Sequence, residues 1–141
     1  IYGIHQCLNV VCGPPSYAGA VLIRALEPKK GVELMWRRRF PEKTYTPKEI
    51  EKLCNGPGRL CEAFGIQKEF YDKTSLIDGP LFLYCEEGSK KLNSGLNITV
   101  DYRIGIKKAA EKKLRFFETG NPYISRPAIA SKIRSRSSIE K

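Results

Sequence analysis

Residues 2–28 contain two short apolar runs separated by a Gly-Pro-Pro-Ser sequence, and this arrangement limits the possible fold more than any other stretch. The first run ends near Val11, and the second is AVLI at residues 20–23. Proline cannot donate a hydrogen bond to a strand ladder and glycine tolerates a tight turn, so residues 13–16 should separate two strands. The pattern therefore predicts a β-hairpin whose second strand ends at Pro28.

The second predicted strand continues into a charged residue, Arg24. Because burying an unpaired charge is costly, an arginine in an apolar strand must pair its charge or point it at a ligand. An edge-strand arginine whose long side chain reaches water is the simpler explanation, and from the residues alone it is favoured. His5 and Asn9 are two further polar side chains within the predicted hairpin.

Three blocks of the sequence carry a family resemblance. The first joins Tyr-Gly at residues 2–3 to Asn9 and to VLIRALEP at residues 21–28. The second is NGPGRLCEAFGI at residues 55–66. The third joins RIGI at residues 103–106 to LRF at residues 114–116 and GNPYIS at residues 120–125. In this order the blocks resemble the alkyladenine (3-methyladenine) DNA glycosylase family, and they cover the chain from Tyr2 to about Ser125.

The resemblance implies a monofunctional glycosylase of base-excision repair, which flips a damaged purine out of duplex DNA and hydrolyses its N-glycosidic bond. The implied substrates are alkylated or deaminated purines of the 3-methyladenine and hypoxanthine types. The expected partner is double-stranded DNA containing such purines, with no membrane and no cofactor, and the protein should be a monomer. We expect it in the cytoplasm or nucleoid of a bacterium, or in the nucleus of a eukaryote.

The resemblance also assigns roles to individual residues. Tyr2 matches the tyrosine that enters the minor groove where the extruded base has left, and Asn9 matches a pocket asparagine that helps to reject guanine. Arg24 and the main-chain carbonyl of Ile104 match the groups that hold the attacking water. Four more residues are expected to contact DNA, namely Ile4, His5, Gly58 and Arg59.

In this family the general base is a glutamate that precedes the Tyr-Gly block, and residues 1–141 contain no counterpart of it. We therefore expect the chain to be the C-terminal portion of the domain, truncated at its N-terminus and lacking the catalytic glutamate. Two carboxylates within the chain, Glu27 and Asp101, could act as bases by their chemistry. An ion pair with a basic neighbour explains each of them better.

We expect an α+β fold, a single mixed domain with a curved antiparallel β-sheet or hairpin core and short flanking helices. Residues 1–125 should form the glycosylase portion. Residues 126–141 lose periodicity and are rich in Ser, Arg and Lys, which predicts a basic flexible tail. A chain of 141 residues suffices for one domain. No apolar run in it approaches the length that spans a membrane.

Charge and cysteine usage narrow the function further. The chain has 25 Lys and Arg against 15 Asp and Glu, a net charge of +10, which favours a polyanionic partner. A basic surface that only keeps the protein soluble explains the same balance. The 5 cysteines are irregularly spaced and the chain has a single histidine, so zinc ligation is unsupported and buried free thiols are expected.

The rest of the chain predicts short elements. We expect helices over residues 32–40, 47–54 and 59–64, the second with a Thr46–Glu49 capping box and the third ended by a left-handed Gly65. We expect strands over residues 81–85, 97–100 and 114–117. The run WRRRF at residues 36–40 suits stacking and phosphate contact, although a helix end with Trp36 inside and the arginines in water is favoured.

Two other classes of function stay open. One is a non-catalytic basic nucleic-acid-binding module, which would bind without excising a base. The other is a small β-barrel of the OB type, which should prefer single strands. The helix, glycine loop and helix over residues 47–64 superficially resemble a helix-hairpin-helix, or simply brace the hairpin. The ordered three-block resemblance argues against both the non-catalytic binding module and the OB-type barrel.

Overall fold

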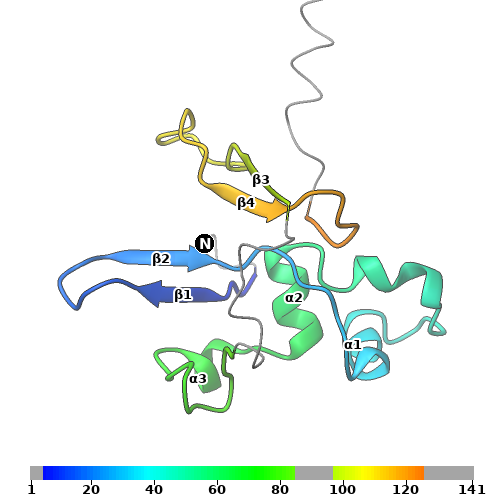
Figure 1. Ribbon diagram of the computed structural model, residues 1–141. Coiled ribbons are helices and arrows are strands. Elements are labelled where there is room, and N and C mark those ends of the chain that lie inside the picture. Colours follow the sequence, from blue (N-terminus) through cyan, green and yellow to red (C-terminus); the bar gives the residue numbers. More distant parts are fainter. Residues whose placement is uncertain (1–4, 85–96, 126–141) are drawn as a thin grey trace, which may run out of the picture. The chain divides into compact units, whose positions relative to one another are not determined.

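The computed structural model describes residues 5–84 and 97–125, and all of its helices and strands are short (Figure 1). In chain order they are β1 (Asn9–Cys12), β2 (Gly19–Leu22), α1 (Val32–Arg39), the 3₁₀-helix η1 (Pro47–Lys52), α2 (Pro57–Phe64), α3 (Lys68–Tyr71), β3 (Ile98–Asp101) and β4 (Arg115–Glu118). Two antiparallel strand pairs with short helices confirm the predicted α+β class. The described residues fall into two compact units, the first within residues 1–87 and 122–125 and the second within residues 88–121.

The predicted N-terminal hairpin is confirmed. Strands β1 and β2 pair antiparallel, with Asn9 opposite Leu22, and the connecting turn contains Gly13 at a φ of 100°. Only glycine adopts such an angle without a steric cost, which explains the residue type at this turn. The pairing continues beyond the regular strands, because the Ile23 N–H donates to the Leu8 carbonyl at 3.0 Å.

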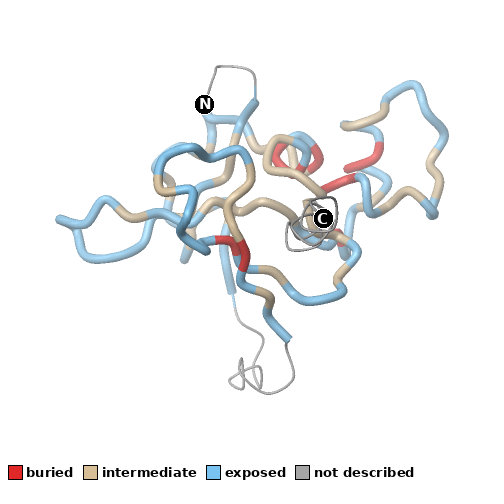
Figure 2. Tube along the Cα trace, turned by 90° about the horizontal axis from the view of Figure 1, so that it is seen from above, coloured by how far each residue is buried: buried red, intermediate tan, exposed pale blue. Residues whose placement is uncertain are grey.

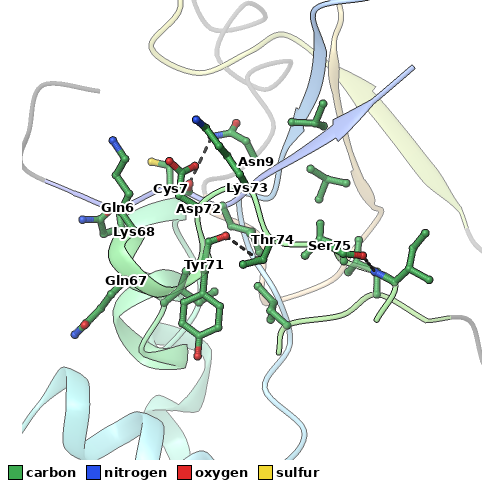
Figure 3. Close-up of a pocket in the computed structure, with 18 of the residues that line it drawn as sticks. Gln6, Cys7, Asn9, Gln67, Lys68, Tyr71, Asp72, Lys73, Thr74 and Ser75 are labelled. Carbon is green, nitrogen blue, oxygen red and sulfur yellow. Dashed lines mark hydrogen bonds between the residues drawn. The ribbon is translucent and has the colours of Figure 1, made fainter. Parts of the chain in front are cut away.

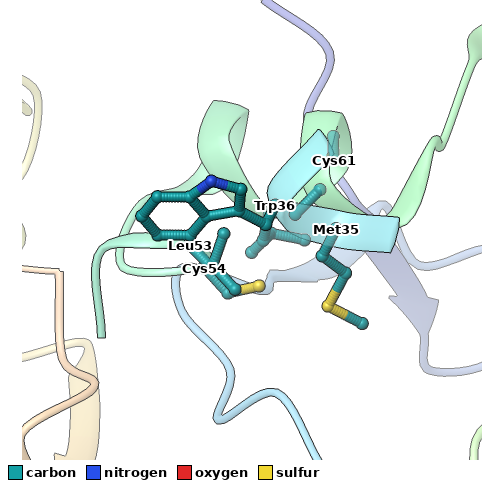
Figure 4. Close-up of a cluster of buried hydrophobic side chains, with 7 residues drawn as sticks. Met35, Trp36, Leu53, Cys54 and Cys61 are labelled. Carbon is teal, nitrogen blue, oxygen red and sulfur yellow. The ribbon is translucent and has the colours of Figure 1, made fainter. Parts of the chain in front are cut away.

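Helices, rather than strands, supply the buried side chains of the first unit (Figure 4). The buried apolar residues are Met35, Trp36, Leu53, Cys54, Leu60, Cys61 and Ala63. They come from α1, from the residues directly after η1 and from α2. Among the described residues, the hairpin reaches this core through the partly buried Leu8 and Ile23, which flank the strands. Every residue of β1 and β2 is exposed or half-buried (Figure 2).

Trp36 is the central aromatic residue of this core. Its ring lies 4.7 Å from that of Phe40 and 5.5 Å from that of Tyr45, measured between centroids. Its indole Nε1–H donates to the Lys43 carbonyl at 2.9 Å, so the polar end of the buried ring is satisfied. The prediction that Trp36 packs inward is therefore confirmed.

The prediction that the neighbouring arginines simply face water is wrong for two of them. Arg38 Nη1 donates to the Ala63 carbonyl at 3.1 Å, and Arg39 Nη1 donates to the carbonyls of Lys52 and Leu53 at 2.9 and 2.7 Å. These carbonyls lie at the C-terminal ends of α2 and η1, where backbone carbonyls have no N–H donor within the helix. The arginines of α1 therefore bind the ends of both following helices.

The predicted helices begin and end differently in two places. The expected α-helix over residues 47–54 is the 3₁₀-helix η1, and the Thr46 side chain makes no capping hydrogen bond. Instead, the Glu49 N–H donates to the Thr46 backbone carbonyl at 3.0 Å. This bond spans three residues, as in a 3₁₀-helix. Helix α2 begins at Pro57, two residues earlier than predicted, and Gly65 ends it at a φ of 70° as expected.

Two further differences concern short segments. Residues 81–84 form no strand, so the expected strand over residues 81–85 is wrong for its described part. Helix α3 was not predicted, because four residues are too few to produce a helical period. Cys85 and the predicted tail over residues 126–141 lie outside the described residues. None of the described helices is long and apolar enough to cross a membrane.

The second unit is built on the hairpin of β3 and β4, which confirms both predicted strands with a shift of one residue. Asp101 pairs with Arg115 across the two strands, and the two side chains form a buried ion pair at 3.3 Å. The Arg115 guanidinium also lies 4.5 Å from the centre of the Phe117 ring. A charge this deeply buried is stable only with such partners.

Gly65 and Gly31 offer a matched test of how α2 is held. Both have a φ of 70°, but a Cβ at Gly65 would lie 2.9 Å from Arg38 Cζ, whereas one at Gly31 would meet no atom within 4 Å. Gly31→Ala should lower the free energy of unfolding by about 1 kcal/mol through backbone strain alone. Gly65→Ala should cost roughly 1 kcal/mol more because Arg38 must leave the Ala63 carbonyl. Equal losses in urea denaturation would contradict this account of Arg38.

Burial raises the pKa of the Cys54 thiol to about 11 from the usual value of 9.0. A raised pKa in the folded state contributes stability below about pH 9 that is lost as the pH rises toward 11, roughly 2–3 kcal/mol in total. Cys54→Ala should therefore reduce the decline in unfolding free energy between pH 8 and pH 10.5, roughly the range over which this thiol titrates. Cys12→Ala, at an exposed thiol, is the control. An unchanged pH dependence in Cys54→Ala would exclude the buried thiol as its source.

Candidate functional site

The structure describes six of the eight predicted site residues. Tyr2 and Ile4 lie outside the described residues. Five of the six belong to the first unit, namely His5, Asn9, Arg24, Gly58 and Arg59. Ile104 belongs to the second unit, where it follows β3.

Arg24 is fixed in place by the backbone on both sides. Before it, the Ile23 N–H donates to the Leu8 carbonyl at 3.0 Å. After it, the Leu26 N–H donates to the carbonyl of the fully buried Cys54 at 3.2 Å. The backbone on both sides of Arg24 is thus held by hydrogen bonds, and the second of them joins the end of the hairpin to the helical core.

The Arg24 side chain has an unsatisfied donor. The residue is half-buried, and its Nε is buried without a hydrogen-bond partner among the described residues. An arginine that only reaches into water would keep this nitrogen solvated, so that interpretation does not account for the burial. Leaving a buried donor unpaired costs stability, and such groups are typical of sites that bind a water or a ligand.

His5, Gly58 and Arg59 come together although 53 or more positions separate His5 from the other two. A Cβ added at Gly58 would lie 3.0 Å from both Cβ and Cγ of His5, so the His5 side chain packs directly on the Gly58 backbone. Arg59 is exposed, and its Nη1 donates to Asn55 Oδ1 at 2.7 Å. A histidine and an arginine therefore flank the first turn of α2.

The first turn of α2 has the properties of an anion-binding helix end. Gly56 precedes the helix in an extended conformation, and no side chain caps it within the described residues. Pro57 has no N–H, and the Leu60 N–H is satisfied by the Gly56 carbonyl at 2.9 Å. The N–H groups of Gly58 and Arg59 remain at the positive end of the helix dipole. Glycines here also allow close approach of a phosphate.

Asn9 lines an open cleft of about 900 Å³ (Figure 3). The cleft lies between the extended residues before and along β1 and the segment that contains α3, with Tyr71 and Thr74 among its lining residues. His5 lines it as well, whereas Arg24, Gly58 and Arg59 do not. Asn9 itself is exposed, and its Nδ2 makes only a long 3.5 Å contact with the Cys7 carbonyl. Its amide is therefore available to a ligand in this cleft.

Ile104 lies three residues after the end of β3, in a turn of the backbone. Ile104 is half-buried, and the following Gly105 has a φ of 73°. Only glycine adopts this left-handed angle without a steric cost, so the residue type fits the turn that follows Ile104.

The two candidate carboxylates are both engaged in ion pairs, as expected. Glu27 lies 2.7 Å from Lys29 Nζ, and Asp101 pairs with Arg115. The buried thiols are not nucleophiles either, because burial raises the pKa of Cys54 and of Cys61. These carboxylates and thiols therefore supply no free general base or nucleophile.

The described residues thus present an exposed amide at a cleft, a buried arginine nitrogen without a partner and an uncapped helix N-terminus. Residues 1–122 match the model of a family described as "Methylpurine-DNA glycosylase (MPG)". The chain therefore belongs to the methylpurine-DNA glycosylase family. The family resemblance of the sequence is confirmed over most of the chain.

Three relatives share the name "Putative 3-methyladenine DNA glycosylase". The protein of Methanoculleus marisnigri is 42% identical over 126 residues, which are 89% of this chain and 62% of the relative. Those of Nitrosospira multiformis and Rhizobium etli are each 40% identical, over 89% and 90% of this chain and 58% and 55% of their own lengths. The chain thus spans somewhat more than half of the length of the curated relatives it matches.

Sequence reasoning missed two features of the site. The cleft beside Asn9 was not foreseen, because α3 and the residues after it have no periodic pattern. The contact between His5 and Gly58 was not foreseen either, because nothing in the spacing of two segments fixes their packing. Gly58 was among the residues expected to contact DNA, and the structure places it in the first turn of α2.

Proposed function

We propose that the protein containing this chain is a base-excision repair glycosylase that removes alkylated or deaminated purines from duplex DNA by hydrolysis. The match of residues 1–122 to the methylpurine-DNA glycosylase family carries the proposal. The relatives' names support 3-methyladenine as one substrate. The net charge of +10 suits a polyanionic substrate. We further propose that the protein acts as a monomer and that residues 1–125 belong to its catalytic domain.

Arg24 and Ile104 have complementary roles in positioning the attacking water. The Arg24 guanidinium donates to the water oxygen, and its buried, unpartnered Nε supports this role. The family resemblance also assigns to the Ile104 carbonyl a hydrogen bond from the attacking water. The water attacks the anomeric carbon of the sugar, and the bond from that carbon to the purine nitrogen breaks with its electron pair leaving on the purine. The proton of the water passes to the general base, which the family resemblance assigns to a glutamate. Fixing the water in this way removes much of the entropic cost of the reaction.

The first turn of α2 and its neighbours contact the DNA backbone. The uncapped N-terminus of α2 attracts a phosphate oxygen, and Arg59 adds a full positive charge beside it. The exposed His5, which packs on Gly58, lies at the same place, and Ile4 directly precedes it in the sequence. Such contacts give affinity that does not depend on sequence.

Tyr2 and Asn9 select the damaged nucleotide. Tyr2 fills the space that the flipped base leaves, which offsets part of the cost of unstacking. Asn9 presents an amide to the extruded base and disfavours guanine. A cationic alkylated purine leaves readily, whereas hypoxanthine is neutral and needs a proton as well as the positioned water.

A single-turnover excision assay on a hypoxanthine-containing duplex tests the proposal. We would compare the 141-residue chain with a chimera that joins it to the part of the Methanoculleus relative that the chain does not match. We expect the chimera to release hypoxanthine and the chain alone to release none, because the family's glutamate has no counterpart here. An undamaged duplex is the control.

Two other outcomes carry different conclusions. Excision by the 141-residue chain alone would show that a general base lies within it, with Glu27 and Asp101 the first residues to substitute. Duplex binding without excision by either protein would contradict the glycosylase proposal and favour a non-catalytic nucleic-acid-binding module.

A further inference from the structure

The loop between β3 and β4 belongs to the second unit (Figure 1). Hydrogen bonds from one arginine, Arg103, link the two ends of part of this loop. Arg103 follows β3 almost directly, and its Nη2 donates to the carbonyls of Lys108 at 2.8 Å and of Ala109 at 2.9 Å. These carbonyls lie five and six residues further along the chain. The guanidinium is half-buried, with its Nε buried and without a partner among the described residues. Arg103 therefore holds the backbone of the loop from inside.

The held backbone is strained. Ala109 has a φ of 51°, and among the described residues only one other non-glycine residue, Lys73, has a positive φ. A residue with a Cβ adopts this angle only when its surroundings impose it, and such strain is common at functional sites. The Ala109 carbonyl also accepts from the Lys112 N–H at 3.2 Å. The shape of the loop is thus fixed by contacts rather than by local preference.

The loop is strongly cationic. Residues 103–113 contain four lysines and Arg103 against one acidic residue, Glu111. Lys107, Lys108 and Lys112 are exposed, and in the described part of the chain no carboxylate pairs with them. A run of lysines on a flexible segment is usually only a solvated surface. Here the same charges are attached to a backbone of fixed shape.

We propose that residues 104–113 form a preshaped loop that contacts the phosphodiester backbone of duplex DNA. Lys107 and Lys108 supply the phosphate contacts, and Arg103 is the positioning residue that holds the loop. This inference rests on the proposed function, since it assumes a duplex DNA substrate. A loop that is already ordered loses little entropy on binding, so its charges give more affinity than the same lysines on a mobile segment.

The hydrogen bonds of Arg103 also link DNA binding to the chemical step. Ile104, whose carbonyl is assigned to the attacking water, is adjacent to Arg103 in the chain. The contacts of Arg103 with Lys108 and Ala109 close the backbone that contains Ile104. Phosphate contacts at the tip of the loop and the position of the Ile104 carbonyl therefore depend on one side chain.

The lysine contacts are tested by the salt dependence of DNA binding. We would measure the affinity of the 141-residue chain for undamaged and hypoxanthine-containing duplexes by fluorescence anisotropy at several salt concentrations. Each lost phosphate contact should lower the slope of log affinity against log salt by about 0.9. Lys107→Gln/Lys108→Gln should lower it by nearly 2, equally on both duplexes. Lys29→Gln/Lys30→Gln removes the same charge from another exposed adjacent pair and should leave the slope nearly unchanged.

The role of Arg103 is tested separately. Arg103→Lys keeps the charge but loses the planar fork that reaches two carbonyls, and it should weaken duplex binding several-fold. Ala109→Gly accepts the same φ without strain and should bind as tightly as the unchanged chain. Ala109→Val disfavours that φ and should weaken binding as Arg103→Lys does. These three variants test the shape of the loop without changing its charge.

The results distinguish the two levels of the proposal. Duplex binding with an unchanged salt slope in Lys107→Gln/Lys108→Gln would overturn the loop assignment and leave the proposed function standing. The affinity for duplex RNA should be measured in the same way. If Lys107→Gln/Lys108→Gln lowered the salt slope for duplex RNA but not for duplex DNA, the proposed ligand would be wrong. No duplex binding by the unchanged chain, even at low salt, would overturn the proposed function together with this inference.

Discussion

The contact on which the first unit most depends is the binding of Arg39 to the helix ends around it. Its Nη1 satisfies the two carbonyls that end η1, and its Nε lies 3.0 Å from a Glu62 carboxylate oxygen, an ion pair without hydrogen-bond geometry. Burial lowers the pKa of this guanidinium and Glu62 opposes the shift. Cys54, just beyond η1, then offers its carbonyl to the Leu26 N–H, so the core fixes the strand exit that follows Arg24. Removing Arg39 would take this donor away from the carbonyl of the buried Leu53.

The candidate site consists of groups that this framework leaves unsatisfied. Arg24 has a buried nitrogen without a partner among the described residues, and α2 begins without a side-chain cap. Each costs some stability, and each is suited to an oxygen of a water or a phosphate. In the second unit, Arg103 donates its hydrogen bonds to backbone carbonyls of a strained, cationic loop. In this chain, cationic side chains hold the backbone as well as serving as candidate DNA contacts.

Local patterns predicted the local structure, and the contacts between distant residues could not be predicted. The Gly-Pro turn, the helix around Trp36 and the left-handed Gly65 each follow from residue types within a few positions. The 3₁₀ form of η1 does not, because a Thr-Pro start specifies a helical turn but not its pitch. The bond of Arg38 to a carbonyl 25 residues away has no sequence signal at all. Family resemblance, rather than spacing, selected Arg24 and Ile104, and the structure adds the unsatisfied nitrogen of Arg24.

The most direct test of this account is the rate of the chemical step in Arg24→Ala. It should be measured by single-turnover excision of hypoxanthine in the chimera with the Methanoculleus segment, beside the affinity of each variant for the lesion-containing duplex. Arg37→Ala is a matched control, because Arg37 is exposed and its side chain forms no hydrogen bond or ion pair with another described residue. If Arg24 holds the attacking water, its loss should lower the excision rate about tenfold or more and change the affinity little. An Arg24→Ala rate equal to that of Arg37→Ala would contradict the account.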